Sequence, residues 1–216
     1  MRRTLKLLAL STALVAAFPA AAQQAEREGN WLVRARAVSV DTANGSTPIA
    51  ALGVPANAIH VENKIIPELD ISYFFTKNIA AELILTVPQK HDVKVTQSAV
   101  GRIDAGSFHL LPPTLTAQWH FNPEGTFRPY VGVGVTYSDY SAVKLSAAGN
   151  NLKLDNDYFG PAVQAGFDIK LGKQLFLNFD VKKAHVRSDL KLDDGTKLSR
   201  VKVDPLLIGV GIGWRF

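Results

Sequence analysis

A strict alternation of apolar and polar residues, repeated in eight segments, constrains the fold of this chain more than any other feature of its sequence. In the last segment every second residue from Leu206 to Phe216 is apolar, and most residues between them are glycine. Successive side chains of a β-strand point to opposite faces of the sheet, and alternation over about ten residues is typical of strands that cross a membrane. The eight segments are residues 30–41, 67–75, 81–87, 111–121, 131–137, 159–169, 175–181 and 206–216.

The lengths of the apolar runs exclude a helical membrane protein. Although 47% of the residues are hydrophobic, no run after the N-terminal region approaches the roughly 18 apolar residues that a transmembrane helix requires. A high apolar content arranged as alternation therefore favours a β-barrel.

The N-terminus has the three parts of a secretory signal peptide. Residues 2–6 include three basic residues, Leu7–Phe18 is apolar, and residues 20–22 are all alanine, which fits a small-residue cleavage site. We expect a cleaved signal peptide over residues 1–22 and a mature chain over residues 23–216. The alternative is a membrane anchor helix, but the apolar run is shorter than the roughly 20 residues that a span needs.

Connections between the segments alternate in length, as they do in bacterial outer-membrane barrels. Short connections lie at residues 76–78, 122–126 and 172–174, and long ones at residues 42–63, 93–107, 143–156 and 188–200. We therefore expect an all-β, eight-stranded antiparallel transmembrane β-barrel with short periplasmic turns and four longer extracellular loops. Trp31, Trp119 and Trp214 then lie at the periplasmic end of the lipid face, as one half of an aromatic girdle.

The distribution of charge decides which face of the barrel is outside. A soluble ligand-binding barrel would place apolar residues inside and polar residues outside. Here one face carries nearly all the charged residues of the eight segments, and a barrel of eight strands has little room inside. The larger, aromatic-rich face is therefore expected to contact lipid.

Composition excludes several classes of function. The chain has no cysteine and so no disulfide and no thiol nucleophile. The formal net charge of +5 includes three cations of the predicted signal peptide, which leaves the mature chain near +2 (5 − 3) without a basic run for nucleic acid. We expect no cofactor and no nucleic-acid partner.

Histidines and serines offer only weak alternatives. His91 and His109 flank one long connection and could approach each other, but a histidine pair lacks the usual ligand set of a metal site. Ser107 and His109 have like parity, as a nucleophile and base would, yet no carboxylate is placed to orient the histidine. We expect no metal, no catalytic residue and no enzyme.

The order of several motifs resembles the outer-membrane protein W family, which includes alkane-uptake barrels. The matching pieces are GNWLVRARAVSVD (Gly29–Asp41), Tyr73–Ala80, Val87-Pro88 with Lys90-His91, Leu111–Leu115, Pro129–Gly134, and Asp204-Pro205 leading to Phe216. The resemblance implies location in the outer membrane and passage of small hydrophobic molecules. It also implies that Phe216 is the C-terminal aromatic signal for the barrel-assembly machinery.

Parity along the strands predicts a lumen divided by polarity. The lower half is expected to be a plug of buried charges, which must pair because isolated buried charges are costly; it comprises Arg34, Arg36, Glu68, Asp70, Glu82, His120, Asp168, Asp180, Lys182 and Arg215. The upper half is expected to be an apolar ligand funnel lined by Val38, Val40, Ile66, Leu110, Tyr140, Tyr158, Val186, Val203 and Leu207.

Three prolines predict a lateral outlet above the plug. Pro88 lies high on the third segment and Pro112-Pro113 high on the fourth. Proline lacks the N–H that a strand ladder needs, and a register centred near Val100 would place Pro88 opposite Pro112. The resemblance points the same way, because family members are thought to release ligands sideways. The alternative is that the prolines only end the ladder at the base of the loop.

These features together lead to a hypothesis of passive uptake of small hydrophobic solutes across the outer membrane. The apolar stretch Pro48–Pro55 in the first long connection is expected to line or cover the mouth of the funnel, or else to pack on its neighbours or dip into lipid. The alternative function is a structural or adhesive barrel that acts as a surface receptor through its loops, without transport.

Overall fold

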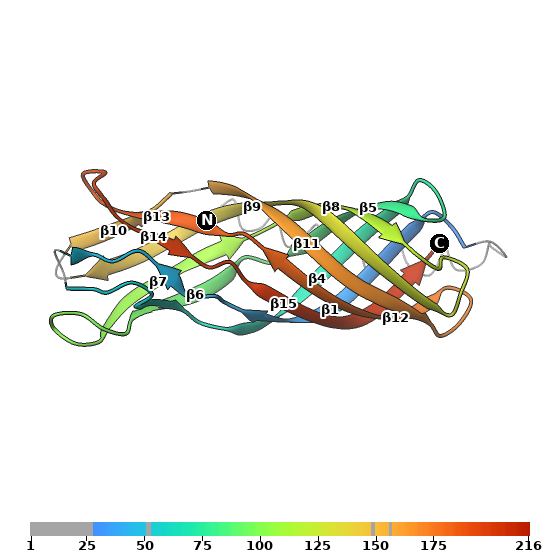
Figure 1. Cartoon of the computed structure of the whole chain (residues 1–216), viewed down its shortest axis with the longest axis horizontal. Helices are drawn as coiled ribbons and strands as arrows, with labels where there is room; N and C mark the ends of the chain where they lie inside the picture. The colour runs from blue at the N-terminus through green and yellow to red at the C-terminus, as the bar shows by residue number, and fades with distance from the viewer. Residues whose placement is uncertain (1–27, 51–52, 148–149, 156) are drawn as a thin grey trace, which may run out of the picture.

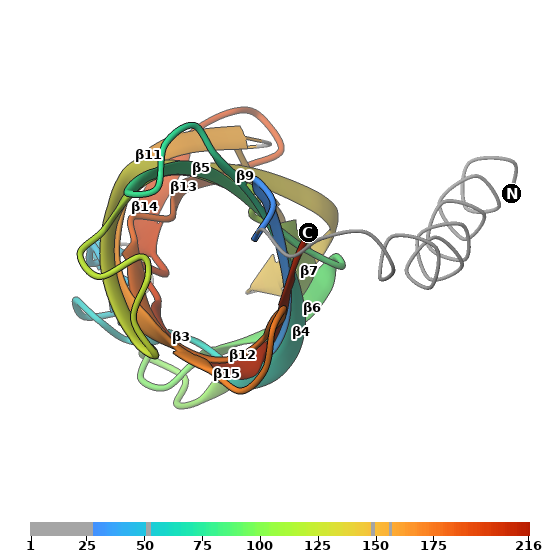
Figure 2. The same ribbon diagram turned by 90° about the vertical axis from the view of Figure 1, so that its right-hand side faces the viewer.

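A closed antiparallel β-barrel forms the whole described part of the computed structural model, which comprises residues 28–50, 53–147, 150–155 and 157–216. Figure 1 shows the long cylinder and Figure 2 the ring of strands seen along its axis. The predicted signal peptide lies outside the described residues. Among the residues that are described, no helix is long and apolar enough to span a membrane.

Eight strands make up the ring, as the alternation predicted. In order around the barrel they are β1 (Trp31–Asp41), β4 (Lys64–Phe74), β5 (Ile79–Thr86), β8 (Thr114–His120), β9 (Phe127–Ala147), β11 (Asp157–Lys170), β12 (Leu175–Ala184) and β15 (Leu206–Arg215). Strand β1 pairs with β15 on one side and β4 on the other, so the first and last strands close the sheet. Closure gives every strand a hydrogen-bonded neighbour on both sides, which is the condition for strands in lipid.

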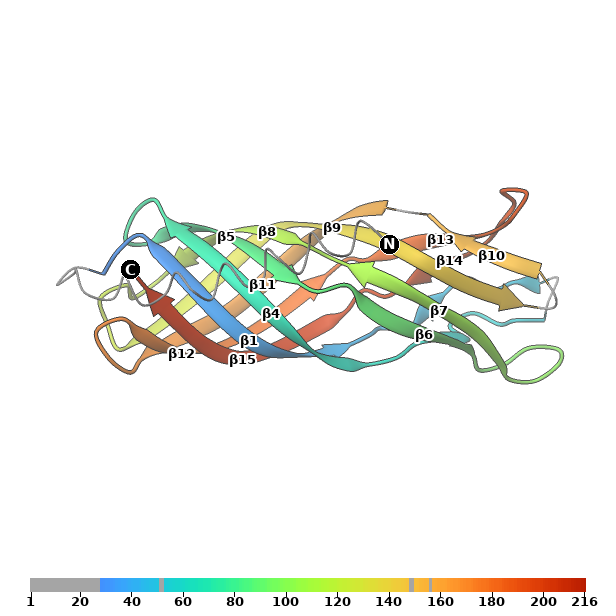
Figure 3. The same ribbon diagram turned by 180° about the vertical axis from the view of Figure 1, so that it is seen from behind.

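The long connections differ from the expectation of loops, because much of their length is also strand. The barrel wall continues beyond the apolar band as the outer part of β9, which pairs with β7 and β10, and as seven further strands. These are β2 (Gly45–Ser46), β3 (Ile59–Val61), β6 (Gln89–Val95), β7 (Ile103–Leu111), β10 (Asn150–Leu154), β13 (Arg187–Leu192) and β14 (Lys197–Lys202). Figures 1 and 3 show this extension at the end opposite the C-terminus. We call it the extension.

Alternation persists through the extension, but its polarity is reversed. In the band that faces lipid, outward residues such as Val133 and Phe159 are 64% and 68% exposed, while inward Arg34 is fully buried. In the extension, Val93 and Leu190 point inward and are buried, and Lys153 is exposed on the outside. The reversal follows the solvent, because lipid surrounds the band and water surrounds the extension.

Aromatic side chains mark the short-turn end of the lipid-facing band. Trp31 and Trp119 are 46% and 47% exposed, and the ring of Trp31 lies 4.8 Å from that of Tyr73. Trp31 and Phe216 exchange backbone hydrogen bonds of 3.0 and 2.8 Å, so the described chain begins and ends at this same end. The arrangement matches an aromatic girdle at one membrane interface.

Replacement of Val133 by lysine tests the assignment of the lipid face. A cation at the bilayer midplane destabilises a barrel by about 2–4 kcal/mol, so Val133→Lys is expected to lower the free energy of unfolding by that amount in lipid vesicles. Ser146→Lys, on the same strand but exposed in the extension, is the control. Urea titration of both variants measures the effect, and equal stability would contradict the assignment.

Candidate functional site

Arg34 is the centre of a buried network in the lower lumen. Its guanidinium donates to both oxygens of Asp168 at 3.1 and 2.7 Å and lies 2.6 Å from Glu82. The same group donates to Ser72 at 3.0 Å, and Ser72 donates in turn to Glu82. Arg34, Ser72 and Glu82 are fully buried. Every one of these charges is paired, which makes their burial tolerable.

Arg36 forms the second layer of the network. Its guanidinium lies 2.5 Å from Asp70, 3.2 Å from Glu68 and 3.4 Å from Asp180. Lys182 adds a further bond of 3.0 Å to Glu68. We call the charged residues of the two layers the central cluster: Arg34, Arg36, Lys182, Glu68, Asp70, Glu82, Asp168 and Asp180.

Inward glycines make room for the two arginines. A Cβ atom on Gly211 would lie 2.6 Å from Cγ of Arg36 and 2.1 Å from the carbonyl oxygen of Ala35, which no real side chain tolerates. A Cβ on Gly213 would lie 3.2 Å from Cγ of Arg34. The glycines of β15 thus let the wall approach the arginine stems in a narrow barrel.

A second ionic group closes the short-turn end of the lumen. Glu28, just before β1, accepts bonds of 2.6 and 2.8 Å from Arg128 and another from Lys170, and lies 3.5 Å from Arg215. We call these four residues the mouth cluster. Burial alone would raise the pKa of Glu28, but the hydrogen bonds from Arg128 and Lys170 outweigh it and hold that pKa at about 2.

The two ionic groups compensate each other in charge. The central cluster has three cations and five carboxylates, and the mouth cluster has three cations and one carboxylate, which gives six of each sign. Of the ten residues predicted for the plug, eight form the central cluster. Arg215 belongs instead to the mouth cluster, and His120 bonds to Gln118 at 3.0 Å and packs on Phe74 and Tyr130.

Several residues that form or bond to the two ionic groups were not among the predicted site residues. Tyr130 donates to Asp180 at 2.8 Å, Asn178 to Asp168 at 2.9 Å, and Gln164 to Glu82 at 3.1 Å. Their inward parity was a usable signal, because they share a face with the predicted charges. Glu28 had no such signal, since it precedes the alternating segments.

Above the central cluster the lumen is filled with apolar side chains. All nine residues predicted for the funnel lie there: eight are buried in one hydrophobic cluster, and Tyr158 packs against it. Seven of the nine do not line the open cavity that lies higher, and Tyr140 and Val203 lie at its inner boundary. We call this filled part of the lumen the apolar core.

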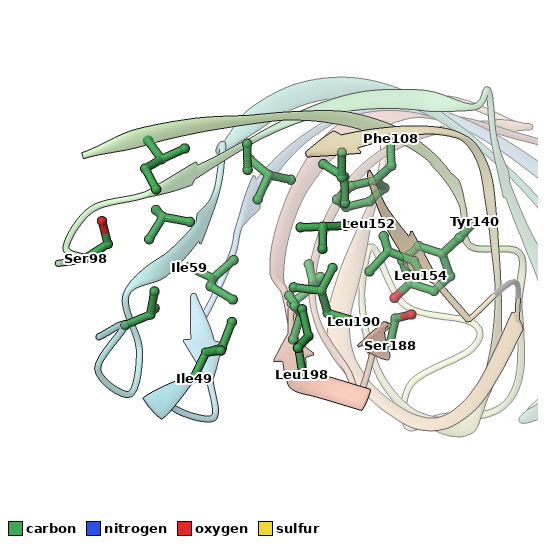
Figure 4. Close-up of a pocket in the computed structure, with 18 of the residues that line it drawn as sticks. Ile49, Ile59, Ser98, Phe108, Tyr140, Leu152, Leu154, Ser188, Leu190 and Leu198 are labelled. Atoms are coloured by element: carbon green, nitrogen blue, oxygen red, sulfur yellow. The ribbon is translucent and has the colours of Figure 1, made fainter. Parts of the chain in front are cut away.

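An open cavity lies higher, inside the extension, with a volume of about 180 Å³. Of the predicted funnel residues only Tyr140 and Val203 line it, so the open site is farther from the membrane than the sequence suggested. Figure 4 shows apolar side chains from several strands converging on it. The strand residues that line it and were missed in the sequence are Ile59, Val93, Val95, Ile103, Ala105, Phe108, Leu145, Leu152, Leu154, Ser188, Leu190, Leu198 and Val201.

The apolar stretch of the first long connection contributes to the cavity wall. Ile49 and Val54 form a small antiparallel bridge, are buried, and line the cavity. Residues 51 and 52 of the same stretch lie outside the described residues. Burial of Ile49 and Val54 removes apolar surface from water, which favours this position for the loop.

The ladder between the third and fourth barrel strands is interrupted above the central cluster. Strands β5 and β8 pair up to Ile84 and Thr114, and pairing resumes between β6 and β7 at Gln89 and Leu110. The intervening stretches, Leu85–Pro88 and Leu111–Pro113, form no ladder pair with each other within the described chain. We call this interruption the seam.

The prolines lie in the seam, but their register differs from the prediction. The pairing of Gln89 with Leu110, if continued by one residue, would bring Pro88 to Leu111 rather than to Pro112. Val95 pairs with Ile103, which centres the hairpin on residue 99 rather than on Val100, and the bulge between Val93 and Lys94 recovers only part of this difference. Val87 beside them is 56% exposed.

Proline alone does not interrupt the wall. Pro67, Pro129 and Pro161 lie within continuous ladders opposite Ala37, Phe167 and Val135. The seam differs because the two strands that border it lose their pairing with each other over several residues, while each still pairs with its other neighbour.

The alternative sites of the sequence do not assemble. His91 is buried in the lumen and stacks on Phe108, whereas His109 pairs with Lys90 on the outer face of the same hairpin, so the two histidines point apart. Nδ1 of His109 has no hydrogen-bond partner that could orient it toward Ser107. Over the described ranges, no group of three or more His, Cys, Asp or Glu is placed to hold a metal ion.

The chain is similar in sequence and in fold to known outer-membrane proteins. The family model of the OmpW family matches residues 27–216. An uncharacterized outer-membrane protein of Sinorhizobium fredii is 41% identical over 86% of this chain and 80% of its own length, and outer membrane protein W of Vibrio cholerae is 30% identical over 94% and 96%. The crystal structure of OprG from Pseudomonas aeruginosa superposes with a TM-score of 0.75 at 24% identity, covering 88% of this chain and 97% of OprG.

Removal of Arg34 tests the dependence of the fold on the central cluster. Arg34→Ala leaves Glu82 and Asp168 buried without their main partner, which is expected to lower the free energy of unfolding by about 3–5 kcal/mol. Lys77→Ala is the control, because the pair of Lys77 with Glu124 is exposed on a short turn and such pairs contribute little. Urea unfolding in vesicles measures both, and an unchanged Arg34→Ala variant would refute the role of the network.

Glu28 predicts a pH-dependent contribution of the mouth cluster to stability. Its pKa in the folded protein, about 2, lies below the ordinary value of 4.5, so its contribution is complete above pH 4.5 and is lost as pH falls toward 2. Glu28→Gln is expected to destabilise the barrel at pH 7, and the difference from wild type should shrink below pH 4.5 and disappear as the pH falls through about 2. Urea unfolding at a series of pH values measures this, and a difference independent of pH would contradict it.

Proposed function

Because this chain belongs to the OmpW family of outer-membrane proteins, we propose that it is a passive conduit for small hydrophobic molecules. Solutes enter the cavity of the extension from outside the cell, pass the apolar core and leave sideways through the seam into the membrane. Relatives that are 41% and 30% identical are outer-membrane proteins, and the barrel is embedded in outer-membrane lipid.

The observation that carries the proposal is the vertical order of polarity in the lumen. An apolar cavity lies above an apolar core, and the core lies above a central cluster of paired charges. The free energy of a hydrophobic solute falls when it leaves water for the cavity. It cannot continue along the axis without separating buried ion pairs, which costs several kcal/mol.

The seam supports a sideways exit at the level where the axis is blocked. Unpaired backbone groups facing lipid are costly, and Pro88, Pro112 and Pro113 reduce that cost because they have no N–H to leave unpaired. Leu110 is buried on the inner side of the seam and Val87 is exposed on the outer side, so an opening there has apolar edges. The side chains of the core are buried against one another, so passage requires them to move.

Export and assembly complete the proposal. A signal peptide over residues 1–22 would be removed during export, leaving residues 23–216 as the barrel. The terminal Phe216 would then be the aromatic residue read by the barrel-assembly machinery. Family and fold are those of outer-membrane barrels that are not known as enzymes.

The alternative is a structural or adhesive barrel whose extension binds a partner without transport. The extension offers a large polar outer surface for such a role. A transport measurement separates the two functions, because an adhesive barrel would not increase the uptake of any solute.

Restoring a backbone donor at the seam tests the proposed route. Cells that carry Pro88→Ala should take up an apolar tracer several-fold more slowly than wild type, because the new N–H strengthens pairing across the seam. Pro161→Ala, the same change in a continuous ladder, should leave uptake unchanged, and a charged tracer should not enter through any variant. If a folded and inserted Pro88→Ala barrel carries the apolar tracer at the wild-type rate, the outlet is not at the seam.

A further inference from the structure

The cavity of the extension is apolar except for three serine and tyrosine side chains. Seventeen of its twenty lining residues are apolar, and Ser98, Tyr140 and Ser188 are the only polar ones among the described lining residues. Figure 4 shows Ser98 at the outer end, and Tyr140 and Ser188 at the inner end, nearer the barrel. The inner end therefore combines an apolar wall with two hydroxyl groups.

Tyr140 has an unused hydrogen-bond donor at this inner end. Its side chain is 4% exposed, and its hydroxyl is buried without a hydrogen-bond partner. Buried polar groups in proteins are nearly always bonded, and leaving one unpaired costs about 1–3 kcal/mol. Tyr140 lines the cavity, and its hydroxyl oxygen is covered by neighbouring atoms, so a bound molecule reaches this unpaired group when the side chains around it move.

We infer that the cavity selects uncharged, mainly hydrocarbon molecules that carry one hydrogen-bond-accepting oxygen, and that the Tyr140 hydroxyl donates to this oxygen. The inference rests on the proposed function, because it specifies which hydrophobic molecules the conduit prefers. Carbonyl compounds, esters and alcohols belong to this class, whereas pure hydrocarbons do not.

The neighbouring hydroxyl fits the same class of ligand. Ser188 donates its proton to the backbone oxygen of Asp155 at 3.2 Å, so its oxygen remains available only as an acceptor. A carbonyl oxygen needs only the donor Tyr140. An alcohol could accept from Tyr140 and donate to Ser188.

The absence of charged side chains among the described residues of the cavity wall argues against an ionised ligand. No cationic side chain occurs among the described lining residues. The nearby carboxylate of Asp204 is occupied by the backbone N–H of Val186 and by Arg187, at 3.0 and 2.9 Å. An ionised carboxylate in the cavity would be buried without a counterion, which is strongly unfavourable.

The volume of the cavity sets the size of the probe. A cavity of about 150 Å³ with an apolar wall is known to bind benzene in another protein, and the present cavity measures about 180 Å³. Benzaldehyde and styrene suit it as a matched pair, because they share a ring and a planar substituent of equal size. Only benzaldehyde carries an acceptor oxygen, and benzoate adds the charged case.

The test compares wild type with Tyr140→Phe, which removes only the hydroxyl. Methyl NMR signals of leucines in the cavity wall, such as Leu154 and Leu190, report binding to the barrel in nanodiscs. Each of the two neutral probes is supplied as vapour at a fixed partial pressure, which fixes its thermodynamic activity in the sample. The amount of probe that dissolves in the lipid then does not affect the comparison between variants. Tyr158→Phe is the control, because Tyr158 packs against the apolar core but is not among the described lining residues.

Wild type is expected to bind benzaldehyde and styrene but not benzoate. Tyr140→Phe should lower the affinity for benzaldehyde by about three- to tenfold, the effect of one neutral hydrogen bond, and leave the affinity for styrene unchanged. Tyr158→Phe should change neither affinity. If styrene binds but Tyr140→Phe does not affect benzaldehyde, or if benzoate binds equally well, the inference is wrong and the conduit stands. If wild type binds neither neutral probe, the cavity is not an entry site, and both proposals fail.

Discussion

The need of every backbone group in lipid for a hydrogen-bond partner governs this structure. It requires the first and last strands to pair, β1 with β15, and so closes the sheet into a ring. Eight strands give a ring too narrow for a water channel. The lumen is therefore filled, and what fills it decides where a solute can go.

Filling the lumen with charge imposes its own condition. Arg34 and Arg36 are buried, so each must meet carboxylates from several strands at once, and the glycines of β15 provide the space for their stems. The excess of carboxylates in the central cluster is matched by the excess of cations around Glu28. The lower barrel is thus filled by a charge-balanced network, and the apolar core and the cavity lie above it.

The polarity of the outward and inward faces of the barrel reverses where the lipid-facing band meets the extension. Outward residues of the band are apolar against lipid, and outward residues of the extension are polar against water, while the inner face changes in the reverse sense. The seam and the apolar core lie at the boundary where the polarity reverses. The proposed route for a hydrophobic solute, from the cavity through the core to the seam, follows this boundary.

The sequence by itself determined the eight strands, the closed barrel, the lipid face and the inward set of charges, because period-two alternation and connection length are local properties of the chain. It also marked the prolines of the seam. Tertiary structure alone decided that Arg215 pairs with Glu28 rather than with the central cluster, that pairing resumes at Gln89 and Leu110 beyond the seam, and that the cavity lies within the extension. These features depend on register, on a bulge and on side chains that meet from distant strands, and no single segment of the sequence contains that information.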